Sequence, residues 1–199
     1  MIDAAQPVWV FGYGSLVAPE SVATTIGRTV TPGDGFAPAT LDDHERRWNY
    51  GSLRQRADWR GPYGHVAGGI VISLGVVRAE GEQANGAVVR VTRAELARLD
   101  RRESDYDRVD VTRLVRVDGD ADVGPIVTYV PRRSAVERYR SARTDGRAAV
   151  RHGYVALVER AFADLGEHHL DRYIATTPTP DVPVVEFDAA WLEDRTDVR

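Results

Sequence analysis

Hydrophobic positions fall in short runs along the chain, separated by glycine, proline and acidic residues. Val8–Val10 is a β-branched and aromatic run that stops before a glycine-rich segment, which predicts a buried strand. Other runs predict strands at 36–41, 65–74, 85–91, 109–117 and 125–130, with 75–84 as a polar connection. Helices are predicted at about 134–143 and 151–165, with shorter ones near 20–30 and 170–174. Strands with inserted and appended helices indicate an α+β domain.

A further helix opens at Thr92–Glu95, where a Thr N-cap with Glu three residues later forms a capping box. At about 100° per residue, Glu103 lies on the same face as Leu96 and Leu99, while Arg102 is expected to point elsewhere. A carboxylate on an apolar face is costly unless it is paired or protonated. Burial would raise its pKa towards neutrality, which suits a general acid/base. The alternative is a helix end whose glutamate reaches water or an arginine.

The segment Phe11–Leu16 reads Phe-Gly-Tyr-Gly-Ser-Leu and follows the first predicted strand. Its glycines permit unusual backbone angles and a close approach to a ligand, and exposed backbone N–H groups there could receive an anion or a carboxylate. A phosphate-binding loop is excluded because Ser15, not Lys, follows the last glycine, Gly14, and a nucleophile elbow is excluded because position 17 is Val. The alternative is a tight turn whose glycines serve geometry alone.

Composition fits one soluble globular domain over 1–199, with a core at about 8–175 and a C-terminal tail at 176–199. The chain has no Cys, which excludes disulfides, a thiol nucleophile and Cys-ligated metals. No apolar run approaches the roughly 20 residues that span a bilayer, and the N-terminus lacks a signal-peptide pattern, so we expect no membrane partner and a cytoplasmic location. The net charge of −4 argues against a nucleic-acid partner.

Three polar segments have less specific interpretations. Trp48–Gly64 interleaves aromatic residues with arginines. The favoured interpretation is a long loop that covers a small-molecule pocket, and the alternative is a groove for single-stranded nucleic acid. The charged run Asp42–Arg47 is interpreted as a solvated face. His168 and His169 are interpreted as surface residues rather than metal ligands, because neighbours in sequence do not share a helix face. No metal and no cofactor are predicted.

Phe11–Leu16 resembles the signature of the γ-glutamylcyclotransferase superfamily, which includes ChaC-type glutathione-degrading enzymes and γ-glutamylamine cyclotransferases. Leu99–Glu103 with the following Tyr106 resembles the family segment Leu-Asp-x-x-Glu…Tyr, in which the Glu is catalytic. The strand with Tyr129 resembles the family's penultimate strand. Asp58–Gly61 resembles the ChaC-type Asp-His-Arg-Gly, with Trp in place of His. The resemblance covers roughly residues 8–175.

This resemblance implies a small, mostly closed mixed β-barrel flanked by helices. It also implies a cofactor-independent enzyme that cyclises a γ-glutamyl amide, amine or peptide to 5-oxoproline and releases the amine, with Glu103 as the general acid/base. The residues that it implies for substrate binding are Tyr13, Gly14, Ser15, Leu16, Tyr106 and Tyr129. The alternative is a non-catalytic relative that binds a small metabolite on the same fold. The sequence does not indicate which γ-glutamyl compound is bound, or the oligomeric state.

Overall fold

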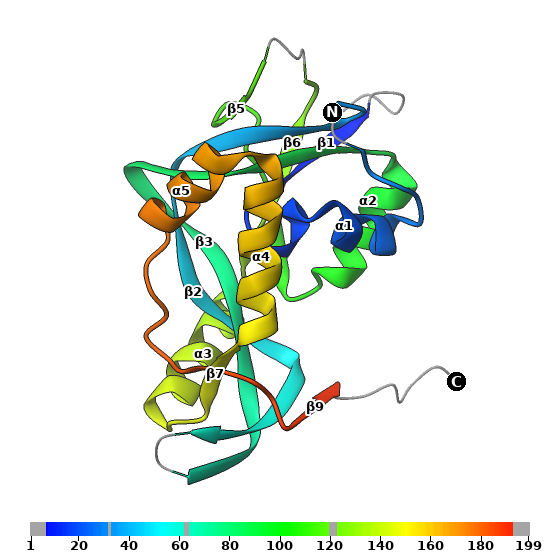
Figure 1. Ribbon diagram of the computed structural model, residues 1–199. Helices are drawn as coiled ribbons and strands as arrows, with labels where there is room; N and C mark the ends of the chain where they lie inside the picture. Colours follow the sequence, from blue (N-terminus) through cyan, green and yellow to red (C-terminus); the bar gives the residue numbers. More distant parts are fainter. Residues whose placement is uncertain (1–6, 32, 62–63, 120–122, 193–199) are drawn as a thin grey trace, which may run out of the picture.

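The computed structural model describes residues 7–31, 33–61, 64–119 and 123–192, without the side chains of 189–192 (Figure 1). These ranges form an α+β fold in which helices flank a nine-stranded mixed sheet, as the sequence predicts. The strands are β1 (Val8–Gly12), β2 (Phe36–Gly61), β3 (Gly64–Val91), β4 (Tyr106–Asp110), β5 (Val115–Val117), β6 (Ile126–Pro131), β7 (Ala148–Arg151), β8 (Val184–Val185) and β9 (Ala189–Leu192). The helices are the 3-10 turn η1 (Ser15–Val17), α1 (Pro19–Ile26), α2 (Arg93–Arg102), α3 (Arg133–Thr144), α4 (His152–Leu165) and α5 (Glu167–Thr176).

The sheet is built around one long antiparallel ribbon formed by β2 and β3 (Figure 1). Strand β1 pairs antiparallel with β3 and parallel with β6, so the strand order is β4-β6-β1-β3-β2-β5. This path has two ends, β4 and β5, and does not close into a ring. The predicted C-terminal tail contributes β8 and β9, which pair with β7 and β2. Among the described residues, no helix has both the length and the apolar character needed to cross a membrane.

Two predicted connections are strands instead. Residues 75–84 continue β3 without a break, and most of 48–64 lies in β2, so the expected long loop over a pocket is wrong. Backbone pairing between the two strands explains both differences, because a hydrogen-bonded partner holds a polar segment extended whatever its own propensity. The predicted strand at 109–117 is also divided, because the chain turns at Val111–Leu114 between β4 and β5.

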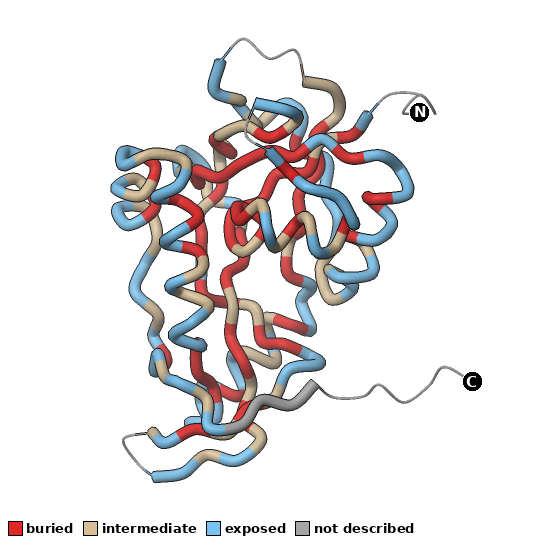
Figure 2. The backbone as a smooth tube through the Cα atoms, turned by 45° about the vertical axis from the view of Figure 1, so that its right-hand side comes forward, coloured by how far each residue is buried: buried red, intermediate tan, exposed pale blue. Residues whose placement is uncertain are grey.

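The core lies between the curved sheet and the helices that cover it, as the buried segments in Figure 2 show. It includes Val10 and Phe11 of β1 and Phe162 of α4, all with no exposed surface. The charged run at 42–47 is not a solvated face, because Arg46 is fully buried there. Its guanidinium lies 4.9 Å from the ring centre of Tyr173 and donates to the backbone and side-chain oxygens of Asn85. These long-range partners accommodate a charge that local sequence assigns to the surface.

Candidate active site

Glu103 stands at the point where α2 ends and the chain turns into β4. Its backbone N–H donates to the Leu99 carbonyl over 2.8 Å, and its own carbonyl accepts from Tyr106 N–H over 2.9 Å. The side chain is 14% exposed. Burial raises the pKa of this carboxyl, and the neighbouring Arg102 acts in the opposite direction. The expectation of a largely buried carboxylate at the end of the apolar face of α2 is therefore met.

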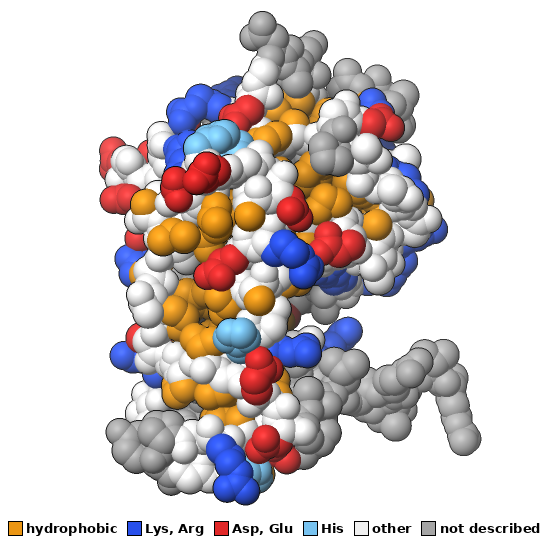
Figure 3. Space-filling model, in the orientation of Figure 1, with side chains coloured by type: hydrophobic (Ala, Val, Ile, Leu, Met, Phe, Trp, Pro, Cys, Tyr) orange, Lys and Arg blue, Asp and Glu red, His pale blue; other side chains and the backbone are white. Residues whose placement is uncertain are grey.

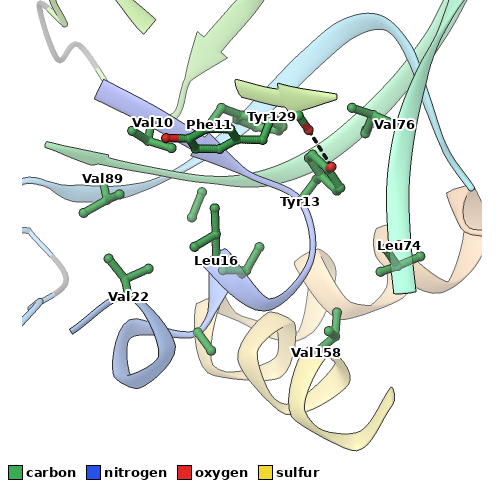
Figure 4. Packing of buried hydrophobic residues seen from close by; sticks show 14 of the residues in the cluster. Val10, Phe11, Tyr13, Leu16, Val22, Leu74, Val76, Val89, Tyr129 and Val158 are labelled. Carbon is green, nitrogen blue, oxygen red and sulfur yellow. Dashed lines mark hydrogen bonds between the residues drawn. The ribbon is translucent and has the colours of Figure 1, made fainter. Parts of the chain in front are cut away.

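A small cavity of about 30 Å³ lies directly at this carboxylate. All seven residues predicted for the site border it, together with Leu74 and Tyr154: Tyr13, Gly14, Ser15, Leu16, Glu103, Tyr106 and Tyr129. The structure thus brings together residues from η1, the end of α2, β4 and β6 that lie far apart in the sequence. Leu16 is also buried among core side chains, where it faces Val22 in Figure 4.

A larger cavity of about 370 Å³ adjoins the small one and shares four of its lining residues: Ser15, Glu103, Tyr106 and Tyr154. One wall is the segment Ser52–Gln55, where the register between β2 and β3 shifts and the chain bulges out of the ribbon. Ser21, Ser73 and Ser104 also line this cavity and contribute hydroxyl groups to its wall. The 48–64 segment therefore borders the site through a bulged strand, not through a long loop.

Three tyrosines at the small cavity differ in the hydrogen bonds that their hydroxyl groups donate within the protein. The Tyr13 hydroxyl donates to the Tyr129 carbonyl over 2.6 Å (Figure 4), and the Tyr129 hydroxyl donates to Asp100 over 2.9 Å. The Tyr106 hydroxyl has only a 3.5 Å contact with the Leu74 carbonyl, at the limit of a hydrogen bond. Burial raises the pKa of all three tyrosines, so each keeps its proton at neutral pH.

Tyr154 of α4 comes close to the loop at Gly14. A Cβ added at Gly14 would lie 2.8 Å from the Tyr154 hydroxyl oxygen, inside normal contact distance. Tyr154 also meets Trp48 edge to face, with ring centres 6.1 Å apart. Tyr154 borders the small cavity but is not in the predicted substrate-binding set, and its approach to residue 14 depends on how α4 packs against the loop.

Arg102 points into the site, contrary to the expectation from helix geometry. Its Nε lies 3.0 Å from Oε1 of Glu103, and Nη2 donates to the Ser15 hydroxyl over 3.1 Å. The same guanidinium donates to the Ser21 carbonyl over 2.8 Å and to the Thr25 hydroxyl over 2.9 Å. A long, flexible side chain in the last turn of a helix can fold back towards its neighbour. Arg102 thereby joins α1, the signature loop and the buried carboxylate.

Comparisons with known proteins bear on the family and the fold of this chain. A family model described as Gamma-glutamyl cyclotransferase, AIG2-like, matches residues 10–147. A solved γ-glutamyl cyclotransferase is 15% identical, with 91% of this chain and 95% of that chain covered and a TM-score of 0.52. A yeast γ-glutamyl cyclotransferase specific to glutathione is 14% identical, with 85% and 95% covered and a TM-score of 0.53. At these identities the two structures show a shared fold.

An Arabidopsis thaliana protein solved in solution is 27% identical over 63% of this chain, with a TM-score of 0.44, and the chain spans 62% of its length. The comparison with curated proteins finds no match. The family model, in contrast, covers more than half of the chain and includes both the signature loop and Glu103. The chain therefore belongs to the γ-glutamyl cyclotransferase, AIG2-like family.

Proposed function

We propose that this protein is a γ-glutamyl cyclotransferase that converts a γ-glutamyl amine, amide or peptide into 5-oxoproline and the free amine. The observation that carries the proposal is the buried carboxylate of Glu103 in a cavity that it shares with the signature loop. The reaction needs little more than a base, a folded substrate and donors for developing negative charge. It therefore needs no cofactor in this site.

Glu103 acts first as the base. Its carboxylate takes a proton from the α-ammonium group of the substrate, and the freed nitrogen attacks the γ-carbonyl carbon to form a five-membered ring. The tetrahedral intermediate then collapses as the bond to the leaving nitrogen breaks, and Glu103 returns the proton to that nitrogen. The ring nitrogen also loses a second proton, which passes to the released amine, so the products are the neutral lactam and an ammonium ion. The atoms of the two products sum to those of the substrate. Burial, which raises the pKa of Glu103, and Arg102, which lowers it, together suit a group that must both accept and return a proton.

The remaining groups hold the substrate in place. Backbone N–H groups of the loop at Tyr13–Leu16 receive the α-carboxylate or the oxyanion. Among the tyrosines predicted to bind substrate, Tyr106 has the hydroxyl proton least committed within the protein, so it donates to the substrate directly. Tyr13 and Tyr129, whose protons are already donated, shape the cavity. The small cavity admits only the reacting end of a substrate, and the adjoining larger one accommodates the rest.

The test is a panel of γ-glutamyl compounds that includes glutathione, γ-glutamyl amino acids and γ-glutamylamines, with 5-oxoproline measured as the product. We expect at least one member to give product in proportion to enzyme, without added metal or cofactor. Binding of panel members without any 5-oxoproline would contradict the proposal and favour the alternative, a non-catalytic relative that binds a small metabolite.

A further inference from the structure

Two histidines and an aspartate meet at a place that has no part in the candidate active site. His168 and His169 lie in the first turn of α5, and Asp118 follows β5 in the turn after that strand. Their nitrogen and carboxylate ligand atoms all lie within 4.8 Å of one another. Figure 3 shows histidine and acidic side chains next to each other on the face that carries α5. None of the three residues lines either cavity at Glu103.

The structure corrects the expectation that both histidines lie on the surface. His169 is only 7% exposed, whereas His168 is exposed. Their ring centres are 3.8 Å apart and the ring planes differ by 42°. Side chains of neighbouring residues diverge on a helix, but a third group lying over the gap between them can face both. Asp118 is that group, and the turn that presents it comes from a distant part of the sequence.

His169 forms a loose ion pair with Asp118. Its Nε2 lies 3.7 Å from Oδ2 of Asp118, too far for a hydrogen bond. Within the described ranges, His169 is the ion-pair partner recorded for the Asp118 carboxylate. A cation between these atoms would be bound by two imidazole nitrogens and one carboxylate oxygen.

The backbone holds these ligands in place from both sides. The His169 carbonyl accepts a 2.8 Å hydrogen bond from the fully buried side chain of Asn85 in β3. The Asp118 N–H donates to the Pro38 carbonyl of β2 over 2.9 Å. Both ligand-bearing segments are thus attached to the central ribbon. Ligand bonds of about 2.0–2.1 Å in a tetrahedral zinc site place ligand atoms roughly 3.3 Å apart, so small side-chain rotations suffice.

We propose that Asp118, His168 and His169 bind one divalent ion of the borderline class, with Zn²⁺ as the probe. Imidazole and carboxylate ligands suit such an ion, and three protein ligands leave a position for water. The ion links the start of α5 to the turn after β5. Because the site is separate from Glu103, its effect is on the stability of the fold, while turnover is unchanged.

The test uses the untagged full chain, freed of metal with a chelator and titrated with ZnCl₂ by calorimetry. We expect one Zn²⁺ per chain and a thermal unfolding midpoint that rises with Zn²⁺ concentration, because an ion that binds only the folded chain stabilises it. Asp118→Asn and His168→Ala change exposed residues and should each weaken Zn²⁺ binding by at least about tenfold. Both variants should remain folded without metal, which their circular dichroism checks.

The matched control is His152→Ala, which removes an exposed histidine whose Nδ1 lies 3.0 Å from Oε1 of Glu186. This variant should bind Zn²⁺ as the wild type does. The proposal is overturned if the wild type shows no saturable Zn²⁺ binding, or if both site variants bind as tightly as the wild type. Stoichiometric binding that disappears in His152→Ala would place the ion elsewhere and would also refute the assignment.

Discussion

The most informative perturbation is Glu103→Gln. Glutamine keeps the size of the side chain, and its amide oxygen can still accept from Nε of Arg102, which lies 3.0 Å from the carboxylate. What it loses is the ability to take the substrate's ammonium proton. General acid–base catalysis contributes a factor of about 10² to 10⁴, so we expect turnover to fall by that factor, or about 2.7–5.4 kcal/mol in the barrier.

The Michaelis constant and the stability should respond differently. Substrate affinity should change little, because the loop residues hold the glutamyl group in our proposal. Burial raises the pKa of Glu103 in the folded chain, so the folded state binds this proton more tightly than the unfolded state does. The ionised carboxylate therefore reduces stability as pH rises above its unfolded pKa of about 4.3. At pH 7 the variant should unfold at an equal or higher temperature than the wild type.

The assay is 5-oxoproline release under saturating substrate, with circular dichroism and thermal unfolding on the same preparations. Asp105→Asn is the control, because Asp105 lines the same large cavity but its carboxylate is engaged by Arg138. It should lose less than tenfold in turnover provided that it remains folded. A folded Glu103→Gln variant that keeps more than about a tenth of wild-type turnover would refute the role of Glu103, since that loss is far below the expected range.

Two further predictions concern the groups around the carboxylate. Arg102→Met should reduce turnover about tenfold and move the acidic limb of the pH–rate profile to higher pH, because Arg102 lowers the pKa of the base, Glu103. Arg98→Met, which removes a hydrogen bond from α2 to the Ile26 carbonyl at the end of α1, should leave that profile in place. Gly14→Ala should impair turnover by displacing the Tyr154 hydroxyl. Adding Tyr154→Phe should restore part of the lost turnover, because the clashing oxygen is gone. A double variant that is as impaired as Gly14→Ala in the same assay would contradict this explanation.

Local sequence determined the parts of the site that depend on neighbouring residues. A strand followed by a glycine-rich turn is specified within residues 8–16, because both the hydrophobic run and the backbone freedom are local. The capping box at Thr92–Glu95 likewise starts α2 through its own hydrogen bonds. Helix periodicity then places Glu103 at the end of the face formed by Leu96 and Leu99, and both leucines are buried.

Long-range pairing decided what local patterns could not. The polar residues 75–84 form part of β3 because β2 supplies their hydrogen bonds. Arg46, in a charged run typical of a surface, is fully buried because Asn85 and Tyr173 meet it from distant segments.

The same holds for individual side chains at the two sites. Arg102 turns towards Glu103 because α1 and the loop offer acceptors that the helix alone does not. Tyr154 reaches Gly14, and Asp118 reaches His169, through the packing of α4 and α5 against the sheet. The energy of a buried polar group depends on partners that only the assembled fold brings within hydrogen-bonding distance, so these contacts became visible only in the tertiary structure.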